Sequence, residues 1–118
     1  MNTPMNKVYD LEERTFRFAK SIALFCKKLP KTTSNFEYIK QLIRSSGSIG
    51  ANYIEANESL GKKDFQMRVK ISRKEAKESA YWLRLIIEIN TQEFRNEGLT
   101  LFQEAEELKK IFSSMVKK

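Results

Sequence analysis

The chain has 118 residues, of which 41% are hydrophobic and 11% aromatic, so it is long enough for a core and too apolar for wholesale disorder. With no histidine and a single cysteine, it lacks the commonest general base, any Ser-His or Cys-His nucleophile pair, a thiolate metal site and an internal disulfide. A net charge of +7, from 22 basic and 15 acidic residues, favours an anionic partner. We therefore expect a protein that is not an enzyme and that carries no cofactor or metal.

The first nine residues are expected to be frayed, followed by one four-helix domain over residues 10–118. The opening MNTPMNKVY lacks the apolar stretch and the small-residue cleavage pattern of a secretory signal. The longest apolar runs, IALFC and LRLII, are too short to span a bilayer. The lone Cys26 is typical of a reducing compartment and is expected to pack as a small hydrophobic residue. These features predict a cytoplasmic protein that does not enter the membrane.

The first predicted helix covers residues 11–29, where apolar side chains recur every three or four positions. Asp10 and Glu13 have the spacing of a capping pair, and Pro30 ends the helix at or just before the preceding residue.

The second predicted helix begins at Ser34, which has the spacing of a capping box with Glu37, and it continues to Leu60, with Gly61 as its C-terminal stop. Its middle, SSGSIGAN, has the composition of a loop. The apolar face nevertheless continues across both glycines, at Ile39, Leu42, Ser46, Ile49 and Tyr53. The unbroken phase predicts a continuous helix through this segment.

Such a helix needs compensating contacts, because each interior glycine costs roughly 1 kcal/mol relative to alanine. Small residues three and four apart leave a shallow groove in its surface. The next predicted helix carries its own small residues, at Ser72, Ala76, Ser79 and Ala80. We expect these two thinned surfaces to pack unusually closely, and Gly50 to be intolerant of a large side chain.

The third predicted helix is capped by Asp64 and extends to about residue 89, and the fourth covers residues 98–116. No useful stretch alternates between apolar and polar residues at every second position, so no strand is expected. The links between helices are short, which makes sequence neighbours antiparallel. The sequence therefore predicts an all-α fold, an antiparallel up-down-up-down four-helix bundle.

Polar and mixed stripes run beside the apolar faces of the second and third helices, so these helices have more than the one buried stripe that a bundle requires. This excess predicts a second interface, most simply between subunits. Its acidic residues are expected to pair with arginines and fix the register, the alternative being ordinary surface charges. The predicted members of this interface or buried polar network are Arg44, Ser48, Asn52, Glu55, Glu75, Glu78 and Arg84.

Two segments, LPKTTSNFEYIKQLIRSSGSIGANYIEAN and KDFQMRVKISRKEAKESAYWLRLI, resemble the 23S rRNA intervening-sequence protein family, also called four-helix-bundle proteins. The resemblance covers about residues 18–87. It implies a left-handed bundle that assembles as a homopentamer and has no catalytic residue. A related branch, the accessory protein of diversity-generating retroelements, accompanies a reverse transcriptase and binds nucleic acid.

The leading functional prediction is a nucleic-acid-binding oligomer that prefers RNA to DNA and contacts phosphates with little sequence specificity. Residues 61–90 contain eight basic and four acidic side chains, so the basic excess is concentrated there. The predicted contacts are Lys62, Lys63, Arg68, Lys70, Arg73, Lys74 and Lys77. The alternative is a protein-interaction scaffold whose partner is a reverse transcriptase or a ribosome-related protein.

Other motifs carry weaker alternatives. The segment from Gly47 to Gly50 has the GxxG spacing of KH domains, but that module requires a sheet, and no Walker A lysine follows. The acidic residues of the fourth helix, Glu104 among them, are better explained as a solvated face than as a metal site. Tyr81 and Trp82 could stack on bases, although Trp82 is in phase with the apolar residues around it and is expected to pack.

Overall fold

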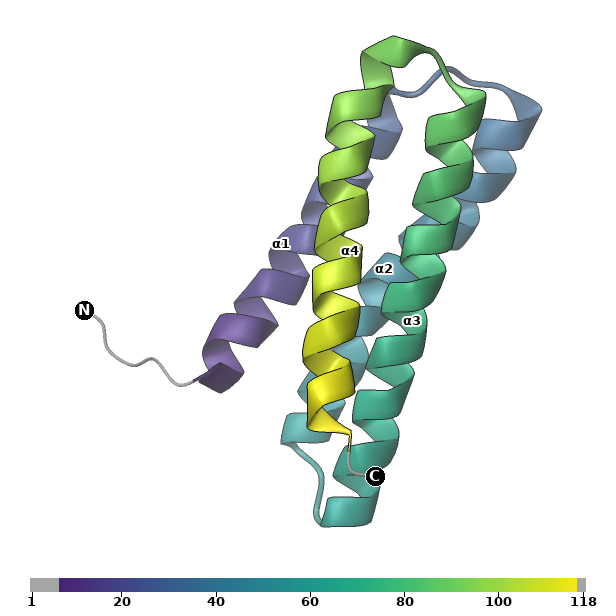
Figure 1. Ribbon diagram of the computed structural model, residues 1–118. Helices are drawn as coiled ribbons and strands as arrows, with labels where there is room; N and C mark the ends of the chain where they lie inside the picture. The colour runs from purple at the N-terminus through teal and green to yellow at the C-terminus, as the bar shows by residue number, and fades with distance from the viewer. Residues whose placement is uncertain (1–6, 117–118) are drawn as a thin grey trace.

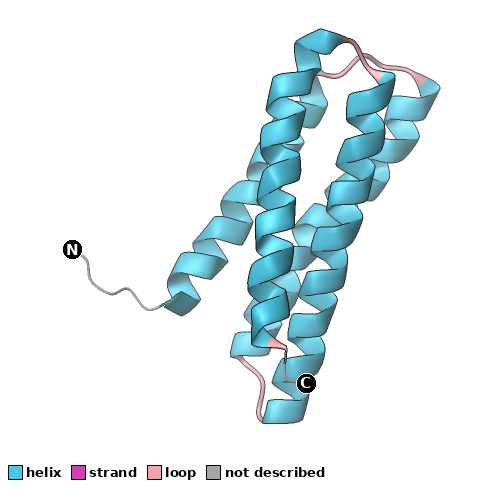
Figure 2. Ribbon diagram, in the orientation of Figure 1, coloured by secondary structure: helices cyan, strands magenta, loops and turns pink. Residues whose placement is uncertain are grey.

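The computed structural model describes residues 7–116, which form a bundle of four long helices measuring 45 × 32 × 20 Å (Figure 1). The helices run up, down, up and down, and no strand is present within that range (Figure 2). The elements are α1 (Lys7–Lys28), α2 (Thr33–Asn57), α3 (Lys62–Ile89), the 3-10 turn η1 (Gln92–Phe94) and α4 (Arg95–Met115). The predicted all-α antiparallel four-helix bundle is confirmed.

The core consists of apolar side chains from all four helices. Its largest fully buried apolar members are Phe25, Phe112, Ile22, Leu42, Ile49, Leu83, Ile86 and Leu108. Tyr53 and Phe112 meet edge to face, with ring centroids 5.6 Å apart. Cys26 is buried, as expected, and burial raises the pKa of its thiol to about 11. The thiol is therefore neutral at physiological pH and packs as a small hydrophobic group.

The four helices do not pack equally. α2 and α4 both pack closely on α3, whereas α1 packs on α2 and touches α4 much less. The N-terminal end of α1 diverges from the other three helices (Figure 1). A groove lies between α1 and α4. None of the helices in the described range is long and apolar enough to cross a membrane.

The first helix begins earlier than predicted. α1 starts at Lys7, so Asp10 lies inside the helix and does not cap it. No proline or glycine separates residues 7–10 from Leu11, so nothing in the sequence stops the helix there. Of the nine residues expected to be frayed, residues 1–6 lie outside the described part, and residues 7–9 are helical.

The N-cap of α2 is Thr32, and not Ser34 as predicted. Its extended backbone leaves the hydroxyl oxygen free to accept a hydrogen bond from the backbone N–H of Asn35, at 3.1 Å. Asn35 is itself anchored, because its amide group donates to the Pro30 carbonyl oxygen at 2.8 Å. Of the two suitable capping residues in the link after α1, the earlier one therefore caps α2.

Thr32→Ala is expected to lower the free energy of unfolding by about 1 kcal/mol, because one N-terminal N–H of α2 loses its acceptor. Ser34→Ala, two residues further on and exposed, is the matched control and should change it by less than about 0.5 kcal/mol. Urea unfolding of the two variants distinguishes them, and equal losses would contradict the assignment of the cap.

The turns around α3 also differ from the prediction. α2 ends at Asn57, three residues before Leu60, and Gly61 caps the start of α3 instead of ending α2. Asp64 lies in the first turn of α3, where its charge complements the helix dipole, but no side chain forms a cap there. α4 begins at Arg95, because η1 turns directly into it three residues before Gly98.

The serine- and glycine-rich segment of α2 is an unbroken helix, as predicted. It approaches α3 through small polar residues: the hydroxyl groups of Ser45 and Ser79 lie 2.8 Å apart, and Ser72 donates to the Ile49 carbonyl oxygen at 2.9 Å. Gly50 faces α1, where a Cβ atom would lie 2.8 Å from Thr15 Oγ1. The segment is therefore thinned toward two neighbouring helices, and the contact with α1 was not foreseen.

Candidate nucleic-acid interface

A groove of about 610 Å³ lies between α3 and α4 and is lined mainly by cations. α3 contributes Lys70, Arg73, Lys74 and Lys77, whose spacings of three and four keep them on one face of the helix. α4 contributes Lys109, which faces them because the two helices pack side by side. Five basic side chains thus converge on a single surface, which we call the basic groove.

The charge of the basic groove is poorly compensated. Its four cations on α3 form no ion pair with any described residue, whereas six cations outside the groove do. Only Lys109 has an acidic partner, Glu106, which lies one turn before it at 3.0 Å. Uncompensated cations held about 5–6 Å apart along a helix can neutralise successive phosphates of a nucleic acid backbone.

A second groove, of about 1,420 Å³, lies at the turn between α2 and α3. Lys62 and Lys63, also predicted contacts, line it together with the fully exposed Leu60. Met67 and Lys70 line both this groove and the basic groove. The two hollows therefore form one continuous surface along the N-terminal half of α3, and six of the seven predicted contacts lie on it.

Arg68, the seventh predicted contact, does not lie on either groove. It is half-buried, and its Nη1 atom donates to Asn52 Oδ1 at 3.0 Å. Asn52 in turn donates to the Ser48 carbonyl oxygen at 3.0 Å. Arg68 therefore connects α3 to α2 and belongs with the predicted polar network.

A separate cluster of the predicted polar residues surrounds Arg44 on α2. Its Nη2 atom lies 2.6 Å from a carboxylate oxygen of Glu78, and its Nη1 atom 3.4 Å from one of Glu75. The Glu75 side chain is only 9% exposed, so the arginine compensates a nearly buried charge. Glu55 and Arg84 lie outside this cluster, exposed and in no ion pair with the described residues. The network joins α2 to α3 within one chain, and a role between subunits stays a prediction.

Three aromatic residues of α2 and α3 form a cluster. Trp82 lies between Tyr38, at a centroid distance of 5.7 Å, and Tyr81, at 5.0 Å. Trp82 packs against the core, as expected. Tyr81 is 57% exposed and lies one helical turn beyond Lys77.

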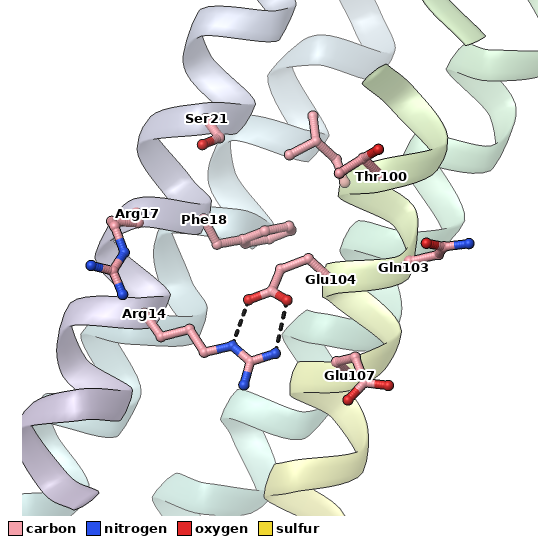
Figure 3. A pocket seen from close by; sticks show the side chains of 9 residues that line it. Arg14, Arg17, Phe18, Ser21, Thr100, Gln103, Glu104 and Glu107 are labelled. Carbon is pink, nitrogen blue, oxygen red and sulfur yellow. Dashed lines mark hydrogen bonds and ion pairs between the residues drawn. The ribbon is translucent and has the colours of Figure 1, made fainter. Parts of the chain in front are cut away.

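The acidic face of α4 consists of ion pairs. Arg14 makes two hydrogen bonds with Glu104, at 2.7 and 2.8 Å, across the groove of about 590 Å³ between α1 and α4 (Figure 3). These bonds raise the pKa of the Arg14 guanidinium above its usual value. Lys28 pairs with Glu97 at 2.9 Å and spans the same two helices. In residues 7–116 no cluster of three acidic, histidine or cysteine side chains is placed to hold a metal ion.

Sequence reasoning missed two features of the basic surface. Lys109 could be identified only from the packing of α4 on α3, because in the sequence it is one of several lysines near the C-terminus. Arg84 was assigned to the polar network, but its spacing of seven residues from Lys77 places it on the same face of α3 as the basic groove. That spacing was the available signal for its position.

A further surface is apolar and exposed. Along the outer face of α2, Phe36, Ile43 and Ile54 are 63%, 42% and 47% exposed, and the exposed Gly47 and Ala51 lie between them. Their spacings of seven, four, four and three residues keep them on one line, which we call the α2 apolar stripe. It lies on another side of the helix from the polar residues that meet α3, so it has no cover within the described chain.

Of three comparisons with known proteins, two give matches that agree with this architecture and one gives no match. The family model described as 23S rRNA-intervening sequence protein matches residues 7–114. A comparison with curated proteins gives no match. The crystal structure of a protein of unknown function from the S23 ribosomal protein family of Bacteroides thetaiotaomicron has a TM-score of 0.81 and 32% identity, covering 96% of this chain and all of that one. The chain belongs to the 23S rRNA-intervening sequence protein family.

Proposed function

We propose that the protein is a non-enzymatic oligomer that binds nucleic acid, RNA in preference to DNA, in the basic groove. The observation that carries this proposal is the convergence of Lys70, Arg73, Lys74, Lys77 and Lys109 with one acidic partner among them. Such a surface neutralises phosphates and releases condensed counterions, which is the main source of affinity in non-specific binding. The family's description, 23S rRNA-intervening sequence protein, supports RNA as the ligand.

Sequence specificity should be low. Four of the five cations are lysines, whose flexible ammonium groups contact phosphate as point charges. Base reading requires fixed donors such as the arginine fork, and Arg73 is the one arginine in the groove. The groove therefore positions a backbone and does not read a sequence.

Self-association would strengthen weak binding of this kind. The α2 apolar stripe supports an interface between copies of the chain, because an exposed row of large apolar side chains usually marks a contact surface. The homopentamer that the family resemblance implies would repeat the basic groove five times. Linked weak sites then bind one RNA with an avidity far above that of a single groove.

The test is the salt dependence of binding to a labelled structured RNA. Replacing Lys70, Lys74 and Lys77 with Gln removes three phosphate contacts and should reduce the slope of log K against log salt by about 2 to 3. The control replaces Lys20, Lys27 and Lys110, which are exposed outside the groove, and has the same net charge. Its slope should match that of the unaltered protein.

A flat response between about 50 and 300 mM salt, or equal slopes for the two triple variants, would contradict binding in the basic groove.

The second candidate, a scaffold for a reverse transcriptase or a ribosome-related protein, is supported by the apolar groove at the α2–α3 turn. There the exposed Leu60 and Met67 line the groove together with Lys62 and Lys63. Such a surface could bind an acidic protein segment that carries one large apolar residue. The scaffold becomes the better explanation if Leu60→Ser abolishes the activity of the protein in the cell while the triple-Gln variant retains that activity.

A further inference from the structure

We propose that Tyr81 stacks on an unpaired base, so that the nucleic acid bound along α3 is single-stranded at this point. This inference rests on the proposed function and names the ligand class of the same surface. It begins from a residue that the fold does not explain: a tyrosine that is 57% exposed and whose hydroxyl makes no hydrogen bond with the described residues.

The position of Tyr81 continues the basic groove. From Lys70, steps of seven, four and three residues lead to Lys77, Tyr81 and Arg84, which keeps all of them on one face of α3. The axial distance from Lys77 to Tyr81 is about 6 Å, and that from Tyr81 to Arg84 is about 4.5 Å. An exposed aromatic ring thus lies between two cations, the order in which phosphates and a base alternate along a single strand.

The ring of Tyr81 is held in place from one side. Its centroid lies 5.0 Å from that of Trp82, and the two ring planes meet at 74°, an edge contact that leaves ring surface open to solvent. Trp82 is itself fixed by Tyr38, at 5.7 Å and 32°, and by the core. A ring supported in this way loses little freedom when a base stacks on it, which favours binding.

A paired base cannot make this contact. In a duplex the bases are stacked on one another inside the helix, and a side chain on the outer face of an α-helix meets only the backbone and the groove edges. A base in a single strand, loop or bulge can turn outward and lie on an aromatic ring. The contact tolerates any base, which agrees with the low sequence specificity expected of the groove.

The experiment compares Tyr81→Leu with Tyr81→Phe, using a labelled single-stranded RNA of about 12 nucleotides and a duplex of the same length. Tyr81→Leu keeps an apolar side chain that suits a helix but has no ring, and it should weaken single-strand binding about tenfold. Tyr81→Phe keeps the ring and should bind like the unaltered protein. Neither change should affect duplex binding, and neither should alter the salt slope, because no phosphate contact is removed.

Fluorescence supplies a second readout, because Trp82 is the only tryptophan in the chain. Single-strand binding should change its emission in the unaltered protein and in Tyr81→Phe, and much less in Tyr81→Leu at saturating RNA. Equal binding of single strands by all three proteins, an equal loss for both RNAs, or binding of the duplex alone would overturn the stacking inference and leave the basic groove standing. If the unaltered protein binds neither RNA at low salt, the proposed function fails together with it.

Discussion

Gly50→Leu is expected to lower the free energy of unfolding by about 2 kcal/mol or more, whereas Gly47→Ala should raise it by about 1 kcal/mol. Both glycines lie in the same stretch of α2, three residues apart. A Cβ atom at Gly50 would lie 2.8 Å from Thr15 Oγ1 and 3.2 Å from Thr15 Cβ, while one at Gly47 would have no neighbour within 4 Å. The pair therefore separates the cost of overpacking from the gain in helix propensity.

Thr15 cannot move aside cheaply. It is almost completely buried, and its hydroxyl donates to the carbonyl oxygens of Leu11 and Glu12, at 2.9 and 3.0 Å. A β-branched side chain in a helix also has few rotamers to choose from. The leucine that replaces Gly50 must therefore push α1 away from α2.

Thermal unfolding is the measurement, with the mass of the assembly recorded alongside because Gly47 lies on the α2 apolar stripe. Each kcal/mol should shift the midpoint by about 4 °C in a chain of this size. Gly50→Ala together with Thr15→Ala should recover part of the loss caused by Gly50→Ala alone, because the second change removes the atom that is struck. A midpoint for Gly50→Leu equal to that of the unaltered protein would contradict the account of the thin helix.

The helices could be predicted from the sequence because each has one continuous apolar face. Even SSGSIGAN followed this rule, since Leu42, Ile49 and Tyr53 keep their phase across both glycines and are buried. Periodicity reports where a helix is buried, and for that reason it identified the fold. It carries no information about where the hydrogen bonds of a helix end.

The predicted helix ends were wrong because apolar periodicity does not report where the hydrogen bonds of a helix end. Thr32 and Ser34 are both good capping residues, and the choice depends on the Asn35 amide group, which is hydrogen-bonded to Pro30 and to Asn90 at the C-terminal end of α3. That tie exists only once the helices have packed. Gly61 similarly suits the end of one helix and the start of the next, and local sequence does not decide between them.

The sequence predicted which cations share a surface where one helix carries them, but not where two helices contribute to that surface. The cations of α3 follow from spacing alone, but Lys109 joins them only because α4 packs on α3. The stripe containing Ser48 and Asn52 was predicted to join subunits or to form a buried polar network, and Arg68 of the same chain contacts it. Exposure of the α2 apolar stripe depends on the position of every neighbouring helix, and no local pattern reports that.

Ile43→Glu combined with Ile54→Glu is expected to dissociate the proposed oligomer while leaving the protomer folded. Both side chains lie on the α2 apolar stripe and are nearly half exposed, so charges there are solvated in the isolated protomer and buried in a subunit contact. Two charges buried without partners should raise the dissociation constant at least 100-fold. The mass in solution should fall from an oligomer, about 70 kDa for five copies of a 13.9 kDa chain, to that of one chain.

The matched control is Leu24→Glu combined with Ile89→Glu, on α1 and α3, where the side chains are 47% and 48% exposed. It introduces the same charge at similar exposure but leaves the α2 apolar stripe intact, so its mass should not change. Both double variants should unfold near the midpoint of the unaltered protein, because the replaced side chains contribute little to the protomer core. Dissociation should also weaken RNA binding to that of a single groove, since avidity is lost while every phosphate contact remains. An unaltered protein that is monomeric, or a stripe variant that keeps the oligomeric mass, would remove the stripe as the subunit contact.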